Sequence, residues 1–176
     1  MIVVGFLGAS GRDGALALEV ARQAAATGAR VEMVGVAAPD AAGDRRLLEL
    51  AAAGVGHATV VRSGADRLDA ADLDLALHYL PDIRAIVLVG PDSSLVAPAE
   101  AESSWSGAGL VLVTAKGSAP DTSSIPQAIV LEPPSSDPDG TFAGLVAALA
   151  ARLDAGQDPS AAWTATTSAL AVDPVS

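Results

Sequence analysis

The chain has 176 residues, 51% hydrophobic and only 3% aromatic, which is enough for one domain with a core built from Ala, Val and Leu. Its 10 basic and 21 acidic residues give a net charge of −11, so nucleic acid and anionic membranes are unsuitable partners. There is no Cys, which excludes disulfides and thiol chemistry, and the two His, His57 and His78, lack metal-ligand spacing. We expect a cytoplasmic protein, because the first apolar segment is short and no run could span a bilayer.

Short apolar segments alternate with helical patterns along the whole chain. We expect strands over residues 2–7, 31–36, 57–61, 83–89, 110–114 and 128–131. The expected helices cover residues 15–27, 45–53, 69–80, 97–105, 141–154 and 160–171. The strands are continuous apolar runs, so both faces of the sheet are covered. The pattern predicts a single α/β domain over residues 1–176, with a doubly wound, mostly parallel sheet and ligands at the carboxyl ends of its strands.

Glycines and the single lysine give weak nucleotide signals. Glycines stand at positions 5, 8, 11 and 14, a spacing that differs from G-x-G-x-x-G and is typical of a tight strand-to-helix turn. Lys116 is followed by Gly117 and Ser118 but lacks the upstream glycine of a P-loop. Trp105 and Trp163 are interpreted as packing residues on helices rather than as stacking platforms.

The loop before the helix expected over residues 141–154 has two conflicting properties. A helix N-terminus has free N–H groups and partial positive charge, which suit a phosphate. Asp137 and Asp139 precede this helix, and their carboxylates would repel one. The two side chains can instead bind Mg²⁺, act as a base, or cap the helix.

Three stretches together resemble the ribokinase-like sugar kinases of the pfkB family. GRDGALALEVA at residues 11–21 is similar to the family's G-G-K-G-A-N-x-A-x-x-A, and VGVAAPDAAGD at residues 34–44 is similar to V-G-x-V-G-x-D-x-x-G. DPDGTFAG at residues 137–144 resembles the C-terminal signature G-A-G-D-x-F-x-G. The resemblance implies a ribokinase-like core without the substrate lid, since the chain is short and also lacks a stretch between Pro120 and Ile125.

The same resemblance implies a set of site residues. Nucleotide contacts would come from Lys116, Gly117, Asp137, Gly140, Thr141 and Gly144, and substrate contacts from Gly11, Arg12, Asp13 and Gly14. ATP and Mg²⁺ would be the cofactors, and a sugar or nucleoside the substrate.

The signature departs from the family where chemistry occurs. In the family, the signature's Asp is the catalytic base and its two glycines belong to the anion hole. Here Gly140 stands at the position of the base, and Asp137 and Asp139 stand at the positions of the glycines. If the alignment shifts by one residue, Asp139 takes the position of the base. Arg12, Asp13 and Leu16 stand at the family's Gly-Lys and Asn positions.

Three functional hypotheses follow. The first is a degenerate ribokinase-like protein without phosphotransfer, acting as a small-molecule-binding or interaction module. The second is an active ATP-dependent kinase of a sugar or nucleoside with Asp139 as base. The third is a structural subunit of a homo-oligomer, with a homodimer as the simplest form, held together by apolar surface that the missing lid uncovers.

Overall fold

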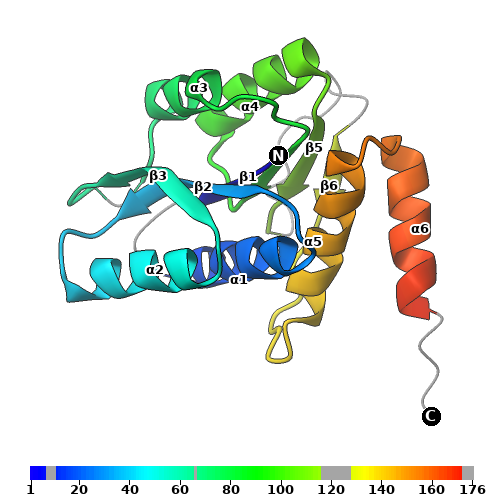
Figure 1. Ribbon diagram of the computed structural model, residues 1–176, viewed down its shortest axis with the longest axis horizontal. Coiled ribbons are helices and arrows are strands. Elements are labelled where there is room, and N and C mark those ends of the chain that lie inside the picture. The colour runs from blue at the N-terminus through cyan, green and yellow to red at the C-terminus, as the bar shows by residue number, and fades with distance from the viewer. Residues whose placement is uncertain (7–10, 66, 116–127, 172–176) are drawn as a thin grey trace.

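The fold is built on one parallel sheet. The computed structural model describes residues 1–6, 11–65, 67–115 and 128–171. The strands are β1 (Ile2–Phe6), β2 (Val31–Ala37), β3 (Gly56–Arg62), β4 (Ala85–Val89), β5 (Gly109–Val113) and β6 (Ile129–Leu131). All neighbours pair in parallel, in the order β3-β2-β1-β4-β5-β6 (Figure 1). The predicted doubly wound parallel sheet is therefore confirmed.

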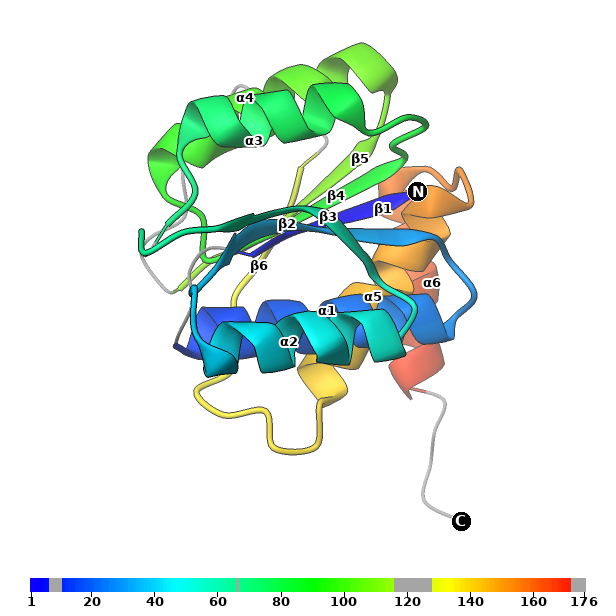
Figure 2. The same ribbon diagram turned by 60° about the vertical axis from the view of Figure 1, so that its left-hand side comes forward.

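Helices cover both faces of this sheet. The helices α1 (Arg12–Ala26), α2 (Ala41–Ala52) and α5 (Thr141–Asp154) lie on one face, and α3 (Ala70–Tyr79) and α4 (Ser93–Ser106) lie on the other (Figure 2). The last helix, α6 (Pro159–Ala171), lies beside α5 (Figure 1). None of the described helices is long and apolar enough to cross a membrane.

The core has two halves, one on each side of the sheet. Val20 and Ala24 of α1 and Leu149 of α5 belong to one buried cluster, while Leu73 of α3 and Leu95 of α4 belong to the other. The sheet itself is fully buried at its centre, which explains why the strands read as continuous apolar runs.

Glycine allows close packing inside the central strands. A Cβ added at Gly5 of β1 would lie 2.6 Å from Cδ2 of Leu88 on β4. Leu88 is completely buried, so it fills the space that a side chain at position 5 would need. The glycine pattern at the start of the chain thus has a packing role at this position.

A buried carboxylate accepts a backbone hydrogen bond at an irregularity between β2 and β3. The register shifts between Glu32 and Val34, and the Glu32 carboxylate accepts a hydrogen bond of 2.9 Å from the backbone N–H of Ala58. Gly56 leaves room for this side chain, because a Cβ there would lie 1.8 Å from Oε2 of Glu32. The acid therefore provides an acceptor for Ala58, whose N–H would otherwise lack a partner at the bulge.

Three helices begin clearly earlier than the sequence pattern predicts. The first, expected over residues 15–27, begins at Arg12. We expected one over residues 45–53, but α2 begins at Ala41, because the Asp40 carboxylate accepts hydrogen bonds from the backbone of Ala42 and Gly43. We expected another over residues 97–105. Instead α4 begins at Ser93 and continues through Pro98. The buried side chains of Leu95 and Val96 hold the turns before the proline against the core.

Candidate functional site

The candidate site lies at the carboxyl edge of the sheet, where the strand order reverses. The chain proceeds from β1 toward β2 and β3 on one side, and β4 begins the other half directly beside β1. In open α/β sheets, ligands bind outside the carboxyl ends of the strands at such a switch point. Two of the stretches that carry the family resemblance, at the starts of α1 and α5, lie at this edge.

The side chain of Asp137 caps the N-terminus of α5. One oxygen of its carboxylate accepts a hydrogen bond of 3.0 Å from the N–H of Phe142, and the other accepts one of 3.0 Å from Ala143. Gly140 adopts the left-handed conformation, with φ of 67°, which turns the chain from the loop into the helix. Two N–H groups that a bound phosphate would need are therefore already satisfied by a carboxylate.

Two polar side chains of α1 support the same turn. Nε2 of Gln23 donates to the backbone oxygen of Gly140 over 3.2 Å and to Oε1 of Glu19 over 2.9 Å. A Cβ added at Gly140 would lie 2.9 Å from Gln23 Nε2, and one at Gly144 would lie 2.8 Å from Gln23 Oε1. Both glycines of the signature are thus explained by close packing of Gln23 against the start of α5.

Asp13 brings a further carboxylate to the switch point. It stands in the first turn of α1, and a Cβ added at Gly90, just after β4, would lie 2.3 Å from its Oδ2. Gly90 has φ of 62° and donates a hydrogen bond of 2.8 Å to the backbone oxygen of Val113. The side chain of Asp13 therefore occupies the space between α1 and the end of β4 and gives it negative charge.

A small cavity joins the starts of α1 and α5. Its volume is about 170 Å³, and its lining includes Arg12, Leu16 and Glu19 of α1 together with Asp137 and Phe142. Ligand pockets are typically about 300 to 1,000 Å³, so this cavity is small for a nucleotide or a nucleoside. Arg12 is exposed and has no hydrogen-bond or ion-pair partner within the described parts of the chain, which leaves one free cation beside the carboxylate of Asp137.

The structure brings only some of the predicted site residues together. Arg12 and Asp137 line the same cavity, whereas Asp13 is directed toward Gly90 and Gly14 is a buried residue of α1. The remaining predicted residues lie at the starts of two helices, as the sequence pattern predicts. They are Gly11 before α1, and Asp139, Gly140, Thr141 and Gly144 around the start of α5. Lys116 and Gly117 lie outside the described residues.

The sequence analysis did not identify Glu19 and Gln23 as neighbours of the signature loop. Their spacing of four residues on the predicted first helix places both on one face, which was the available signal. The signal does not say which other element that face meets.

The described residues do not form a metal centre. Within residues 1–6, 11–65, 67–115 and 128–171, no group of three or more His, Asp or Glu side chains lies close enough to hold a metal ion. Each oxygen of Asp137 accepts one backbone hydrogen bond, which leaves its other lone pair open to a cation. The carboxylate nevertheless occupies the N–H groups of Phe142 and Ala143, which a phosphate at the start of α5 would need.

The interpretation of Trp105 as a packing residue is wrong. Its side chain is 86% exposed, because the buried stripe of α4 consists of Leu95, Val96 and Ala99, and Trp105 lies on a different flank of the helix. Trp163 of α6 is 37% exposed and lines a shallow hollow beside β6, so it is partly packed.

Comparison with known proteins identifies the fold. No protein-family model and no curated protein matches the sequence. Among solved structures, the chain is similar to an E. coli protein assigned as Ribokinase II in complex with ATP and Mg²⁺, with a TM-score of 0.60 and 13% identity over 94% of this chain and 89% of that one. A protein called Sa239 is similar with a TM-score of 0.60 and 12% identity, covering 99% of this chain and 97% of that chain.

A fructokinase from Xylella fastidiosa is similar at lower coverage. Its TM-score is 0.52 and its identity 12%, over 95% of this chain and 69% of the fructokinase. These structures confirm the ribokinase-like α/β fold that the sequence motifs predict. At such low identities the similarity concerns the fold alone, and the chemistry has to be argued from the site itself.

Proposed function

We propose that this protein is a degenerate ribokinase-like protein that does not transfer phosphoryl groups and acts as an interaction module. The observation that carries the proposal is the carboxylate of Asp137, which accepts hydrogen bonds from Phe142 and Ala143 at the start of α5. In the family that the motifs resemble, this helix start would hold phosphate. Here the chain supplies its own anion.

The electrostatics of the site argue against phosphoryl transfer. The negative charge that develops on a transferred phosphoryl group needs N–H donors and cations. A phosphate at the start of α5 would have to displace Asp137 from two hydrogen bonds and then remain beside its charge. Asp139 adds a second carboxylate to the same loop, and Gly140 supplies no side chain at the position of the family's catalytic base.

An active kinase is the second candidate, and one observation favours it. Asp139 is exposed and has no hydrogen-bond partner within the described parts of the chain, so its carboxylate is available as a base. Mg²⁺ would have to offset the local negative charge. The structural similarity to an E. coli protein in complex with ATP and Mg²⁺ gives this candidate its cofactors, and a sugar or nucleoside would be its substrate.

Calorimetric titration with Mg-ATP separates the two candidates. The proposal predicts no saturable heat with the wild-type protein and no ADP release with a panel of sugars and nucleosides. Saturable binding together with ADP release that is abolished in Asp139→Asn would overturn it and establish the kinase. Asp92→Asn is the matched control, because Asp92 is a carboxylate at the end of β4 that pairs with Arg67 and lies outside the signature loop.

A further inference from the structure

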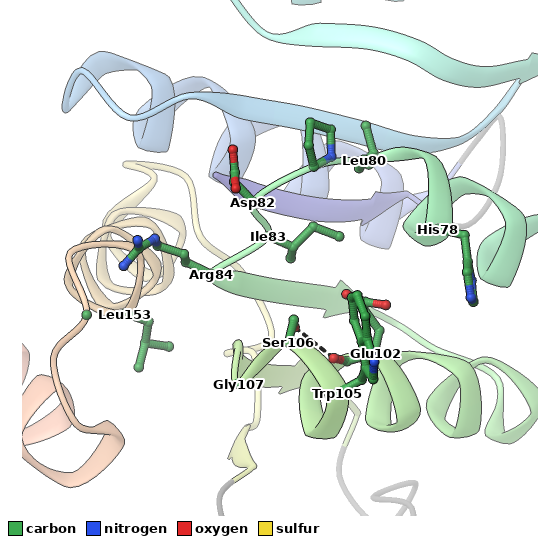
Figure 3. A pocket seen from close by; sticks show the side chains of 12 residues that line it. His78, Leu80, Asp82, Ile83, Arg84, Glu102, Trp105, Ser106, Gly107 and Leu153 are labelled. Carbon is green, nitrogen blue, oxygen red and sulfur yellow. Dashed lines mark hydrogen bonds between the residues drawn. The ribbon is translucent and has the colours of Figure 1, made fainter.

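A wide hollow lies at the edge of the sheet opposite to the candidate site. It has a volume of about 630 Å³ and surrounds the carboxyl-terminal ends of α3, α4 and α5. Figure 3 shows His78, Glu102 and Trp105 near one end of this hollow and Arg84 and Leu153 near the other. Neither the resemblance to kinases nor the proposed loss of phosphotransfer accounts for it.

The hollow continues into a groove between α3 and α4. The groove has a volume of about 400 Å³ and shares His78, Leu80, Glu102 and Trp105 with the larger hollow. Its floor is apolar, with Leu77, Leu80 and Ala101, and its walls carry one carboxylate from each helix, Asp74 and Glu102. We call this continuous surface the α3–α4 groove.

Trp105 lines the α3–α4 groove with an exposed aromatic side chain. With 86% of its side chain exposed, it leaves a large apolar area in contact with water and contributes little to the core. Its side chain lines both the hollow and the groove. An exposed apolar side chain at a hollow marks an interaction site, and tryptophan is prominent among residues that dominate binding.

The α3–α4 groove is acidic, with Asp74, Asp82 and Glu102 in its lining against His78 and Arg84, the latter at the far end of the hollow. Neither α3 nor α4 contains Lys or Arg, and their acidic residues are Asp72, Asp74, Glu100 and Glu102. His78 is the only basic residue on either helix, and it faces Asp74, with 3.6 Å between its Nδ1 and Oδ1. A second copy of the chain, with a net charge of −11, would meet this surface with repulsion. A basic partner would be attracted to it.

We propose that the α3–α4 groove binds a basic amphipathic peptide segment of a partner protein. An apolar side chain of the peptide rests on Leu80 and Ala101, Lys or Arg side chains pair with Asp74 and Glu102, and a guanidinium stacks on Trp105. This inference rests on the proposed interaction role and names its partner class.

Selection of phage-displayed random dodecapeptides on the wild-type protein tests this proposal. Trp163→Phe leaves Trp105 as the only tryptophan, so its fluorescence reports binding of the selected synthetic peptides directly. We expect peptides with Lys or Arg beside an apolar residue, and affinity about tenfold lower in Trp105→Ala or in the double variant Asp74→Asn, Glu102→Gln. Binding should weaken with added salt. Leu48→Ala, on exposed α2 at the other face, is the control and should bind normally.

Four outcomes would overturn the proposal. Selection could yield no peptide, or acidic peptides, or peptides whose affinity is the same in Trp105→Ala. Sedimentation of the wild-type protein as a dimer that becomes monomeric in Trp105→Ala would mean that a second copy occupies the groove. ADP release with Mg-ATP would refute the proposed loss of phosphotransfer but would leave peptide binding unchanged, so the two failures are distinguishable.

Discussion

Removing the carboxylate of Asp137 should destabilise the protein measurably. Asp137→Ala deletes both hydrogen bonds to the start of α5, each 3.0 Å long, and a negative charge at the positive end of the helix. A charge-assisted hydrogen bond contributes about 1.5 to 3 kcal/mol and an N-cap about 1 kcal/mol. Asp137 is only half-buried, so water can replace part of what is lost. We therefore expect a loss of about 2 kcal/mol, which corresponds to about 4 to 8 °C in Tm for a chain of this size.

Urea unfolding followed by circular dichroism measures the effect, and the neighbouring residue supplies the control. Asp139→Ala removes an exposed carboxylate from the same loop without deleting a described hydrogen bond, so it should change stability by less than about 0.5 kcal/mol. Asp137→Asn keeps one acceptor oxygen and should lie between the two, near 1 kcal/mol, by the same reasoning. Equal midpoints for Asp137→Ala and Asp139→Ala would refute the capping role.

The same variants show whether Asp137 stands in for an external anion. Once the carboxylate is removed, the N–H groups of Phe142 and Ala143 become available at a helix N-terminus. Inorganic phosphate should then raise the Tm of Asp137→Ala more than that of Asp139→Ala, because only the first has a vacated site. An equal rise in both variants would show that the ion acts through the solvent and not at α5.

Three further predictions use other contacts. Gly144→Ala places a Cβ near 2.8 Å from Oε1 at the movable end of Gln23, and the gain in helix propensity of about 1 kcal/mol offsets the shift of that side chain, so urea unfolding should show a net loss of less than about 0.5 kcal/mol. Glu32→Ala removes the acceptor of the Ala58 N–H at the bulge and should cost about 1 to 3 kcal/mol in the same assay. Trp105→Ala should change the free energy of unfolding by less than about 0.5 kcal/mol and leave Tm almost unchanged, because the side chain is 86% exposed.

The fold could be predicted from the sequence because its signals are local. Each strand is a short apolar run ended by turn residues, and α5 begins and ends where its cap and apolar stripe predict, at Thr141 and Asp154. The starts of α2 and α4 differ from the predicted ones because the Asp40 side chain caps α2 and because the buried Leu95 and Val96 hold the first turns of α4 against the core. In both cases the boundary depends on a specific capping or packing contact rather than on periodicity.

The site was predictable only in part, because it depends on contacts between distant segments. The sequence offered capping as one role for Asp137, but the partners Phe142 and Ala143 follow from the three-dimensional turn at Gly140. The contact between Gln23 and Gly140 joins residues 117 positions apart, and no local pattern reveals it. The exposure of Trp105 could have been inferred from the helical phase of α4, had its start been placed correctly.

The two edges of the sheet differ in how completely folding explains their residues. At the carboxyl edge, Gly140 and Gly144 make room for Gln23, and Asp137 satisfies the start of α5, so stability alone accounts for residues that resemble a phosphate site. At the opposite edge, Trp105 and Tyr79 remain exposed and add little to the core. A large aromatic side chain in water contributes little packing, so folding explains Trp105 less well than it explains the signature loop. This contrast is why we assign the interaction of this protein to the α3–α4 groove rather than to the edge where kinases of this fold would carry out catalysis.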